Sequence, residues 1–409
     1  MAWNGPKWIS SWHNFAPDVT ADFSLPEKVQ IYDWTLEGDG EEMPGMVFTE
    51  DERLEIAKAL DEVGVNSINV GWLSSTFPED VGAIRKVAKL GLAANVEVCV
   101  EMKKPTIDLA IESDMRGVLM ELPSSDAWIE SRHMSRENIL DQAIEMITYA
   151  KDHGLNVTFG LQDATRADRG FLEDYVETLT LETKLDVMLI ADSMSVASPE
   201  GFRHLIGMVK KWTKIPIAVH CHDDFGLATA NALAAVTAGA NIVTTTVNGI
   251  GERCGLTSLE ETAVALRVLY GVDTGIKLEK LRKLSRIVER ATTPLISSLK
   301  SVVGDRAFAW EMDRFVEAKR TLDASGLLKA GLPYEPDLVG NDFKFYPGKK
   351  IGVQGIKWEA ERLGFNLTDQ QAEQLVDKIK ELSIRKRQPN SEDFLNMLKK
   401  IETTSTDLT

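Results

Sequence analysis

The chain has 409 residues and a formal net charge of −17, which argues against a general affinity for nucleic acid or for an anionic membrane. This length exceeds the size at which one core usually stops growing, so we expect one large domain and a smaller one. Three widely spaced cysteines form neither a disulfide framework nor a zinc pattern, and we find no signal peptide or membrane-spanning run, so we expect a soluble, cytoplasmic protein.

After an N-terminal extension over residues 1–28, short β-branched runs alternate with amphipathic stretches as far as residue 272. Eight such pairs are typical of a (β/α)8 TIM barrel over residues 29–272, a member of the α/β class. A doubly wound open sheet is the alternative, and the count of eight disfavours it. The expected strands cover residues 29–36, 66–72, 95–102, 117–123, 156–163, 185–193, 215–224 and 241–249.

Several residues predict helix ends within this pattern. Thr49 with Glu52, and Thr257 with Glu260, have the spacing of a capping box, in which side chains bond the free amides of a first turn. Asp224 is expected to cap the helix that follows the seventh strand.

The alternation of strand-like and helical segments stops after residue 272, and we expect residues 273–409 to form a smaller, mostly helical region. Helices are predicted over 277–301 and 370–387, with a stretch rich in proline and glycine over 331–350 between them. This region is expected to cover the barrel mouth or to form a homodimer.

The seventh expected strand ends in Val-His-Cys-His, which places His220 and His222 two residues apart. Residues at this spacing face the same side of a strand, and catalytic groups of such barrels lie at the C-terminal strand ends. Neutral imidazole is a good ligand for zinc, manganese or iron. Two histidines that satisfy local hydrogen bonds are the alternative. An acidic loop over residues 33–45, after the first strand, favours a cation site with nitrogen and oxygen ligands.

Five segments of the chain resemble the DRE-TIM metallolyase family, which includes isopropylmalate, homocitrate and citramalate synthases and hydroxymethylglutaryl-CoA lyase. The resemblance is collinear over nearly the whole barrel. It rests on "YDWTLEGDGEEMPG", "LQDATRADRGFL", "ADSMSVASPEGF", "HCHDDFGLATANALAAVTAGA" and "NGIGERCGLTSLEE".

The resemblance implies a divalent metal ion (Mn²⁺, Zn²⁺ or Mg²⁺) held by Asp39, His220 and His222. In the family such an ion binds a 2-oxo acid or the alkoxide of the product, and acts as a Lewis acid when a carbon–carbon bond forms or breaks. An acyl-coenzyme A thioester is the implied co-substrate. The implied partners are therefore small molecules, a 2-oxo acid or an acyl thioester, with no nucleic acid and no membrane.

The sequence departs from the family at positions that carry chemistry. The arginine before the metal aspartate is missing, and a lost guanidinium removes several kcal/mol of oxyanion stabilisation. Leucine cannot coordinate, so water or Asn248 would have to replace the family's asparagine ligand. The substituted positions are Gly38 (arginine in the family), Leu256 (asparagine), Gln162 (an acidic residue), and Trp310 and Phe315 (histidines of the synthases).

Three functions therefore remain open. The first is a Claisen-type condensation of an acyl-CoA with a 2-oxo acid, and the second is a lyase or hydrolase that acts on a 3-hydroxy- or 3-oxoacyl compound. The third is a binding relative without turnover. Polar residues at other strand ends are candidate catalytic groups, namely Glu101, Lys103, Gln162 and Asp192, and Lys103 or Lys104 is a candidate to replace the missing arginine.

Overall fold

The computed structural model describes residues 5, 7–37, 40, 43–76, 78–292, 296–313, 318, 321, 332–387 and 389–406. These residues divide into two compact units. One unit comprises Ser11–Ile296, and the other comprises Asn4–Ser10 with Ser297–Thr409. The first unit extends past residue 272, because α12 (Leu281–Ala291) packs against α3 (Glu50–Val63).

Eight strands of the first unit close into a parallel barrel in chain order, with β1 paired to both β2 and β8. The expected TIM barrel is therefore confirmed. The strands are β1 (Gln30–Asp33), β2 (Ser67–Leu73), β3 (Asn95–Val100), β4 (Gly117–Pro123), β5 (Asn156–Gln162), β6 (Val187–Asp192), β7 (Ile217–Cys221) and β8 (Ile242–Thr245).

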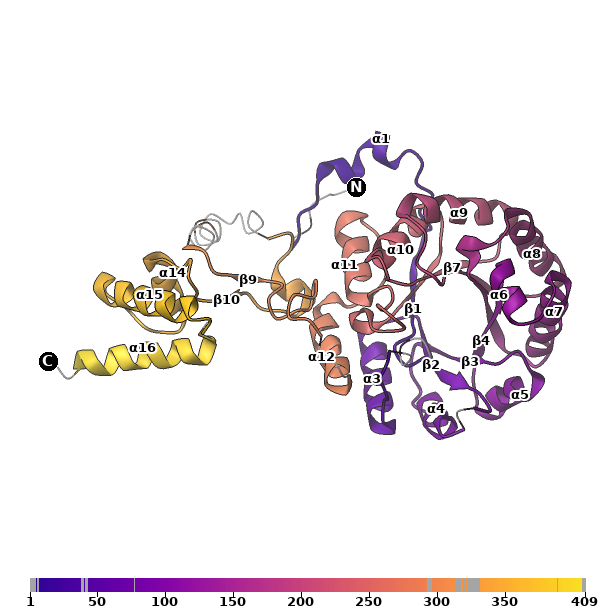
Figure 1. Cartoon of the computed structure of the whole chain (residues 1–409), viewed down its shortest axis with the longest axis horizontal. Coiled ribbons are helices and arrows are strands. Elements are labelled where there is room, and N and C mark those ends of the chain that lie inside the picture. Colours follow the sequence, from indigo (N-terminus) through magenta and orange to yellow (C-terminus); the bar gives the residue numbers. More distant parts are fainter. Residues whose placement is uncertain are drawn as a thin grey trace. The chain divides into compact units, whose positions relative to one another are not determined.

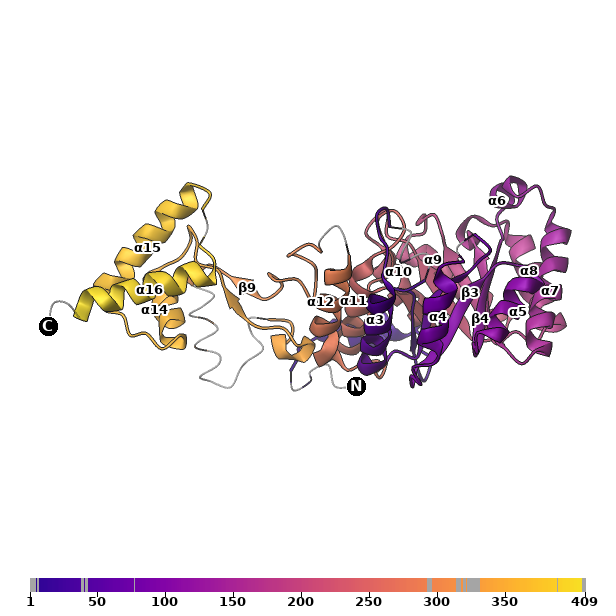
Figure 2. The same cartoon turned by 90° about the horizontal axis from the view of Figure 1, so that it is seen from below.

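Helices surround the strands in a ring (Figure 1). They bury the outer faces of the strands, which is the packing that a parallel sheet requires. After α3 they are α4 (Asp80–Ala88), α5 (Lys104–Glu112), α6 (Asp126–Ser131), α7 (Arg136–Asp152), α8 (Arg169–Glu182), α9 (Pro199–Trp212), α10 (Ala228–Thr237) and α11 (Leu259–Leu269). In the view from below, α6 projects beyond the other helices at one end of the barrel (Figure 2).

The helix ends test the expected capping residues. Thr49 and Glu52 form the predicted capping box at α3, and this prediction is confirmed. The prediction for Thr257 is wrong, because α11 starts one residue later, with Ser258 as its N-cap. Glu260 accepts hydrogen bonds from the Ser258 hydroxyl and from a loop amide instead.

Large side chains fill the interior of the barrel beneath its C-terminal end. Tyr32 and Trp34, at and just after β1, are 2% and 1% exposed, and they pack with Leu119, Leu189 and other buried residues. The barrel is therefore closed to water at its centre, and polar chemistry is confined to its ends.

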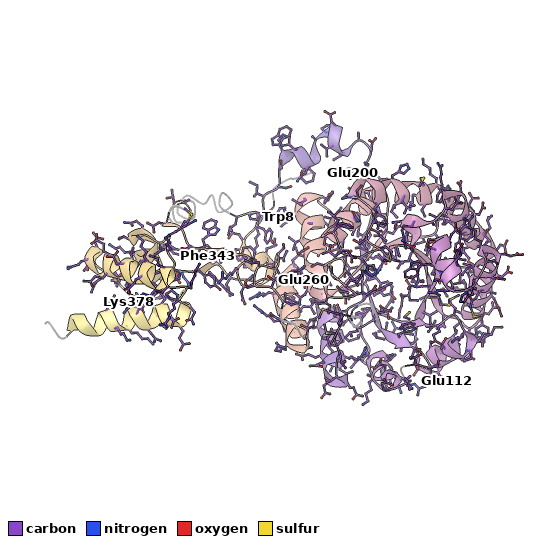
Figure 3. The ribbon with its side chains drawn as sticks, viewed as in Figure 1. Trp8, Glu112, Glu200, Glu260, Phe343 and Lys378 are labelled. Atoms are coloured by element: carbon purple, nitrogen blue, oxygen red, sulfur yellow. The ribbon has the colours of Figure 1, made fainter. Side chains whose placement is uncertain are left out.

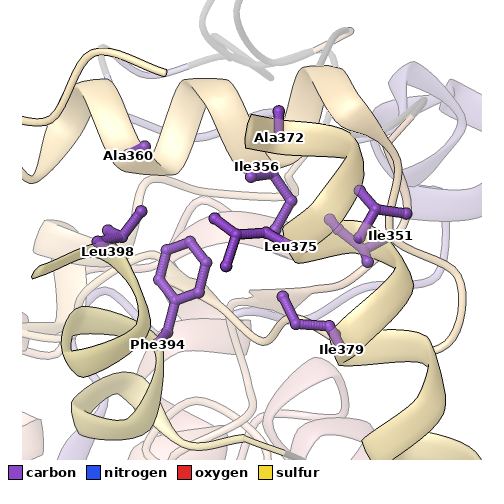
Figure 4. Packing of buried hydrophobic residues seen from close by; sticks show 9 residues of the cluster. Ile351, Ile356, Ala360, Ala372, Leu375, Ile379, Phe394 and Leu398 are labelled. Atoms are coloured by element: carbon purple, nitrogen blue, oxygen red, sulfur yellow. The ribbon is translucent and has the colours of Figure 1, made fainter. Parts of the chain in front are cut away.

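The second unit has a separate core between three helices. Figure 4 shows Phe394 and Leu398 pointing toward Ile356 and Leu375. The unit also contains a small parallel pair of strands. Its elements are β9 (Ala309–Trp310), β10 (Lys344–Phe345), α14 (Val353–Arg362), α15 (Asp369–Ile384) and α16 (Ser391–Thr406).

The C-terminal predictions are confirmed only in part. The helix predicted over 370–387 corresponds to α15, whereas the helix predicted over 277–301 ends at Ala291. Among the residues that the structure describes, none of the helices has both the length and the apolar character needed to cross a lipid bilayer.

Candidate active site

Two histidines converge at the C-terminal end of β7. His220 lies within the strand, His222 follows its last residue, and each is 3% exposed. Their Nε2 atoms are 3.1 Å apart, and the ring planes are inclined at 76°. The spacing in sequence therefore has the predicted consequence, because both imidazoles turn a nitrogen toward one point.

The hydroxyl group of Thr244 determines which nitrogen of His220 carries a proton. This hydroxyl donates to the carbonyl oxygen of Val219 at 3.1 Å, and its oxygen lies 2.9 Å from Nδ1 of His220. A hydroxyl has one hydrogen to donate, so Nδ1 of His220 must be the donor in the second contact. The Nε2 atom of His220 is then unprotonated and can accept a hydrogen bond or bind a cation.

Trp34 holds the same imidazole from another side. Its indole stacks on His220, with ring centroids 4.6 Å apart and planes inclined at 30°. Because Trp34 is itself buried in the barrel interior, the orientation of His220 is fixed by packing as well as by the bond to Thr244.

His222 has an acidic neighbour on its other nitrogen. Oε2 of Glu252 lies 3.8 Å from Nδ1 of His222, and Oε1 of Glu252 pairs with Arg253 at 2.7 Å. A carboxylate beside Nδ1 favours a proton there and leaves Nε2 available as a ligand. Arg253 also binds both oxygens of Asp224.

The capping role predicted for Asp224 is therefore wrong, since its carboxylate is bound to Arg253. The neighbouring Asp223 accepts the bond from the amide of Ala228, the first residue of α10, at 2.8 Å.

The arrangement of the two imidazoles fits a shared divalent cation. Ligand nitrogens lie about 2.0–2.1 Å from an ion such as zinc, so two of them are about 2.9 Å apart at a right angle and about 3.4 Å apart at the tetrahedral angle. The 3.1 Å between the Nε2 atoms falls between these separations. Asp39, the implied third ligand, and Gly38 lie outside the described residues. Within the described part of the chain, no group of three or more His, Cys, Asp or Glu side chains is arranged to hold a metal ion.

Leu256, which stands where the family has asparagine, and Asn248, the candidate replacement ligand, both make other contacts. Leu256 is 4% exposed and forms a β-bridge to His222. The side-chain amide of Asn248 donates to the carbonyl oxygen of Ser285 at 3.1 Å, and its oxygen accepts from the Ser285 hydroxyl at 2.6 Å. The backbone amide of Asn248 donates to Glu260, which Figure 3 labels. Asn248 is thus bound to α12 and not directed at the histidine pair.

A cavity of about 570 Å³ includes the histidine pair in its wall. Its wall includes large apolar side chains, namely Trp72, Met102, Leu122, Trp128 and Met134. The lining also includes charged side chains, namely Glu37, Glu101, Glu121 and Glu252, with Lys103 and Arg132. Because the carboxylates outnumber the cations, the cavity attracts a positive ion toward the imidazoles.

Glu101 and Lys103 lie together at the rim. The carboxylate of Glu101 accepts from the Ser74 hydroxyl at 2.7 Å and from the Lys103 ammonium group at 3.1 Å. The bond from Ser74, followed by the bond from Lys103, lowers the pKa of Glu101, which is therefore ionised at neutral pH. The side chain of Lys103 is 65% exposed, so it can adjust to a ligand. Lys104 instead pairs with Glu145 at 2.7 Å.

Asp192 is a buried anchor for the loop after β6. It is fully buried, and it accepts bonds from the Thr165 hydroxyl at 2.8 Å and from the amides of Val196 and Ala197 at 3.0 and 3.2 Å. It is not among the residues that line the cavity. The structure thus separates Asp192 from Glu101, Lys103 and Gln162, which do line it.

Gln162 connects two charged side chains of the cavity wall. Its Nε2 donates to Glu121 at 3.1 Å, and its Oε1 accepts from Arg132 at 2.8 Å. Sequence reasoning identified Gln162, but it missed Arg132. This arginine follows α6, nine positions beyond the end of β4, and only the fold brings it back to the strand ends.

Trp310, which the resemblance places opposite a histidine of the synthases, lies in β9 of the second unit. Its indole packs edge-on against Phe343, with ring centroids 5.8 Å apart. Phe315 lies outside the described residues. Trp310 cannot exchange a proton as histidine does, so its indole supplies no acid/base group at this position.

Comparison with known proteins matches the barrel to one family. A family model described as HMGL-like matches residues 28–288. A homocitrate synthase of Methanothermobacter thermautotrophicus is 36% identical, over 93% of this chain and 96% of the relative. An (R)-citramalate synthase of Methanocaldococcus jannaschii is 36% identical, over 91% of this chain and 74% of the relative. A 2-isopropylmalate synthase of the same organism is also 36% identical, over 91% of this chain and 71% of the relative.

Solved structures share the fold at lower identity. Hydroxymethylglutaryl-CoA lyase from Pseudomonas aeruginosa is 20% identical, with a TM-score of 0.58, over 69% of this chain and 97% of that chain. An HMG-CoA lyase from Acinetobacter baumannii, solved in complex with coenzyme A and 3-methylmalate, is 17% identical with a TM-score of 0.56, over 64% and 91%. At these identities the likeness supports the architecture alone.

Proposed function

The chain belongs to the HMGL-like family, the DRE-TIM metallolyases, and from that membership we propose that it condenses an acyl-CoA with a 2-oxo acid in a divalent-metal-dependent, Claisen-type reaction. The observation that carries the proposal is the convergence of the two Nε2 atoms, 3.1 Å apart, in the wall of the cavity. Relatives that match along nine tenths of this chain are synthases by name.

His220 and His222 would hold the ion, with Asp39 as the implied third ligand. A bound divalent cation would supply Lewis-acid polarisation of the carbonyl group of the 2-oxo acid. Thr244 and Trp34 keep the His220 imidazole in the required orientation and protonation state. This preorganisation matters because side chains that are already in place need no rearrangement when charge develops.

The remaining residues of the wall would position the substrates. Ionised Glu101 keeps the ammonium group of Lys103 at the rim, where it can meet an anionic group. The apolar side chains of the wall, which include Trp72 and Trp128, would limit the water that contacts a bound substrate. Exclusion of water strengthens every electrostatic contact made inside.

A lyase or hydrolase that acts on a 3-hydroxy- or 3-oxoacyl compound is the second candidate. The loss of a histidine at Trp310 favours it, because bond cleavage beside a cation does not require the removal of a proton from an acetyl methyl group. The two candidates use the same histidine pair, so they differ in direction and substrate and not in the cation site.

The test measures release of free thiol from acetyl-CoA with pyruvate, 2-oxoisovalerate or 2-oxoglutarate, with Mn²⁺ and after chelation by EDTA. We expect release that requires both a 2-oxo acid and the metal. The double variant His220→Ala/His222→Ala should lose at least about 100-fold in activity and should no longer bind Mn²⁺ tightly. His204→Ala is the matched control, because His204 lies on α9 and is exposed.

Cleavage of 3-hydroxy- or 3-oxoacyl thioesters, with no thiol release from acetyl-CoA, would select the second candidate. Equal activity in the wild type and in the double variant would exclude the histidine pair from either reaction.

A further inference from the structure

The geometry points to Arg132 as the residue that selects the 2-oxo acid, by binding a second carboxylate at the far end of a dicarboxylic substrate. This inference rests on the proposed function, since it specifies the substrate class of the same cavity. Arg132 and the histidine pair both line that cavity, and Arg132 comes from the part of the rim formed by the segment after β4. In Figure 2 the helix that it follows, α6, stands beyond the other helices at one end of the barrel.

A relay of hydrogen bonds holds the guanidinium group at the cavity. Arg132 donates to Oε1 of Gln162 at 2.8 Å, and Nε2 of Gln162 donates to Glu121 at 3.1 Å. The orientation of the amide is unambiguous, because a guanidinium group only donates and a carboxylate only accepts. Gln162 therefore anchors Arg132 by one of its five N–H groups and leaves the others for a ligand.

The positive charge of Arg132 has no ionic partner in the described part of the chain, where its one side-chain hydrogen bond goes to the neutral Gln162. Nearby arginines differ in this respect. Arg136 binds both oxygens of Asp126 at 2.8 Å, and Arg166 binds Asp163. A guanidinium group that is held by an amide keeps its full charge available, and it matches a carboxylate in a two-pronged contact.

The wall of the cavity indicates what connects the two ends of the ligand. Trp72, Met102, Trp128 and Met134 are apolar or aromatic and line the same cavity as Arg132. Such a surface favours methylene groups and offers no partner to a polar chain. A ligand that satisfies both ends has a 2-oxo acid group at the histidine pair, a short aliphatic chain, and a second carboxylate at Arg132.

The replacement of an acidic residue by glutamine at position 162 is consistent with this role. A glutamate there would form an ion pair with Arg132, and it would also lie beside the carboxylate of Glu121. In Gln162→Glu, the new carboxylate should therefore pair with Arg132 and weaken its binding of an anion, while the arginine itself stays in place.

The experiment compares 2-oxoglutarate with 2-oxobutyrate, a diacid with a monoacid, as substrates and as ligands. For the wild type, Arg132→Gln and Gln162→Glu, it measures kcat/KM with acetyl-CoA and Mn²⁺. It also measures the dissociation constant of each acid by calorimetry without acetyl-CoA, which does not depend on turnover. Arg136→Gln is the matched control, since Arg136 lies four residues away and is bound to Asp126.

We expect the wild type to favour the diacid, and both variants to reduce the ratio of diacid to monoacid by at least about tenfold, the loss expected for a charge-assisted contact. Arg136→Gln should keep the ratio of the wild type. If the wild type binds the diacid preferentially but releases no thiol, the condensation fails and the role of Arg132 stands.

Two results would overturn the role of Arg132. One is an equal loss for diacid and monoacid in Arg132→Gln. The other is an increase in KM that is confined to acetyl-CoA, which would place a phosphate of the coenzyme at this arginine.

Discussion

On the side of the barrel mouth formed by β7, β8 and β1, the polar side chains are buried and joined by hydrogen bonds. Asp33, Thr244, His220 and His222 are 0, 2, 3 and 3% exposed. On the side formed by β3, β4 and β5, the charged groups reach solvent, as the 65% exposure of the Lys103 side chain shows. The buried side can hold an ion in a fixed geometry, and the exposed side can adapt to the substrate.

The difference has an energetic meaning. A buried polar group that loses its hydrogen-bond partner is left with the full cost of its desolvation. An exposed ion pair, by contrast, contributes little to the free energy of unfolding. Substitutions on the buried side should therefore have large effects, and those on the exposed side small ones, apart from contacts made by the substrate itself.

The largest effect is expected from Asp33→Asn. Asp33 accepts bonds from the amide of Thr35 and the hydroxyl of Thr245, at 3.0 and 3.2 Å, and burial raises its pKa to about 7. In the unfolded chain an aspartate ionises near pH 4, so ionisation favours unfolding as the pH rises from about 4 to about 7. The stability contributed by this group is complete below pH 4 and is lost through that range.

Asparagine keeps an acceptor for the amide of Thr35 and does not ionise. As the pH rises from 4 to 8, the free energy of unfolding of the variant should therefore exceed that of the wild type by up to about 4 kcal/mol. Chemical denaturation at several pH values measures the gain. Asp273→Asn, on an exposed loop, is the control, since the side chain of Asp273 is 64% exposed. Parallel stability curves for the wild type and Asp33→Asn would contradict the prediction.

The next effect is expected from Thr244→Val, which removes the acceptor for Nδ1 of His220. His220 can then rotate or change its protonated nitrogen, and Mn²⁺ affinity should fall by about 10- to 100-fold. Calorimetric titration with Mn²⁺ measures this loss, and Thr244→Ser should restore the affinity.

Thr237→Val is the matched control for this variant. Thr237 is similarly buried, at 3% exposure, but its hydroxyl donates only to the carbonyl oxygen of Ala234 in the same helix. Unchanged Mn²⁺ affinity in Thr244→Val would mean that the bond to Thr244 does not determine the orientation of His220 or which of its nitrogens is protonated.

A smaller effect is expected from Gly160→Ala on the exposed side. A Cβ atom at this position would lie 2.6 Å from Oε1 and 2.9 Å from Cγ of Glu121, so that side chain must shift and loosen its hold on Gln162. Since the clash includes the stem of the glutamate as well as its flexible end, the cost in stability should be about 1–3 kcal/mol. The preference for a diacid should fall with it.

Thermal unfolding and the ratio of kcat/KM values measure these two effects. Gly207→Ala is the control, because no atom lies within 4 Å of the added Cβ and alanine favours the helix there. A ratio that stays at the wild-type value despite the displaced carboxylate would show that Glu121 does not hold the relay in place.

The smallest effect on stability is expected from Lys103→Gln. Its ion pair with Glu101 is exposed, so the free energy of unfolding should change by less than about 1 kcal/mol. The pKa of Glu101 should rise only slightly, because the bond from Ser74 is the main cause of its lowering.

Turnover tests whether Lys103 replaces the missing arginine. Lys103→Gln should then reduce kcat/KM more than Lys104→Gln does, because Lys104 is paired with Glu145 on α7. Equal values for the two variants would remove Lys103 from the list of catalytic candidates.

The sequence was informative wherever local patterns carry the signal. The alternation of strands and helices predicted the barrel, and the spacing of His220 and His222 predicted their common face, because a strand has a period of two. It failed for contacts between distant segments. Asp192 has a strand-end position like that of Gln162, yet its oxygens are bound by the loop after β6. The expected homodimer stays a prediction.

The sequence by itself determined the architecture and the two imidazoles, since hydrophobic periodicity and the i, i+2 spacing are properties of neighbouring residues. Only the tertiary structure decided which groups surround them. Thr244 and Trp34 meet His220 because β8 and β1 lie next to each other when the barrel closes, and Arg132 returns to the cavity because α6 ends above Gln162. The type of each side chain is given by the sequence. The hydrogen-bond and packing partners that fix its orientation and protonation depend on closure of the barrel, and spacing along the chain does not predict them.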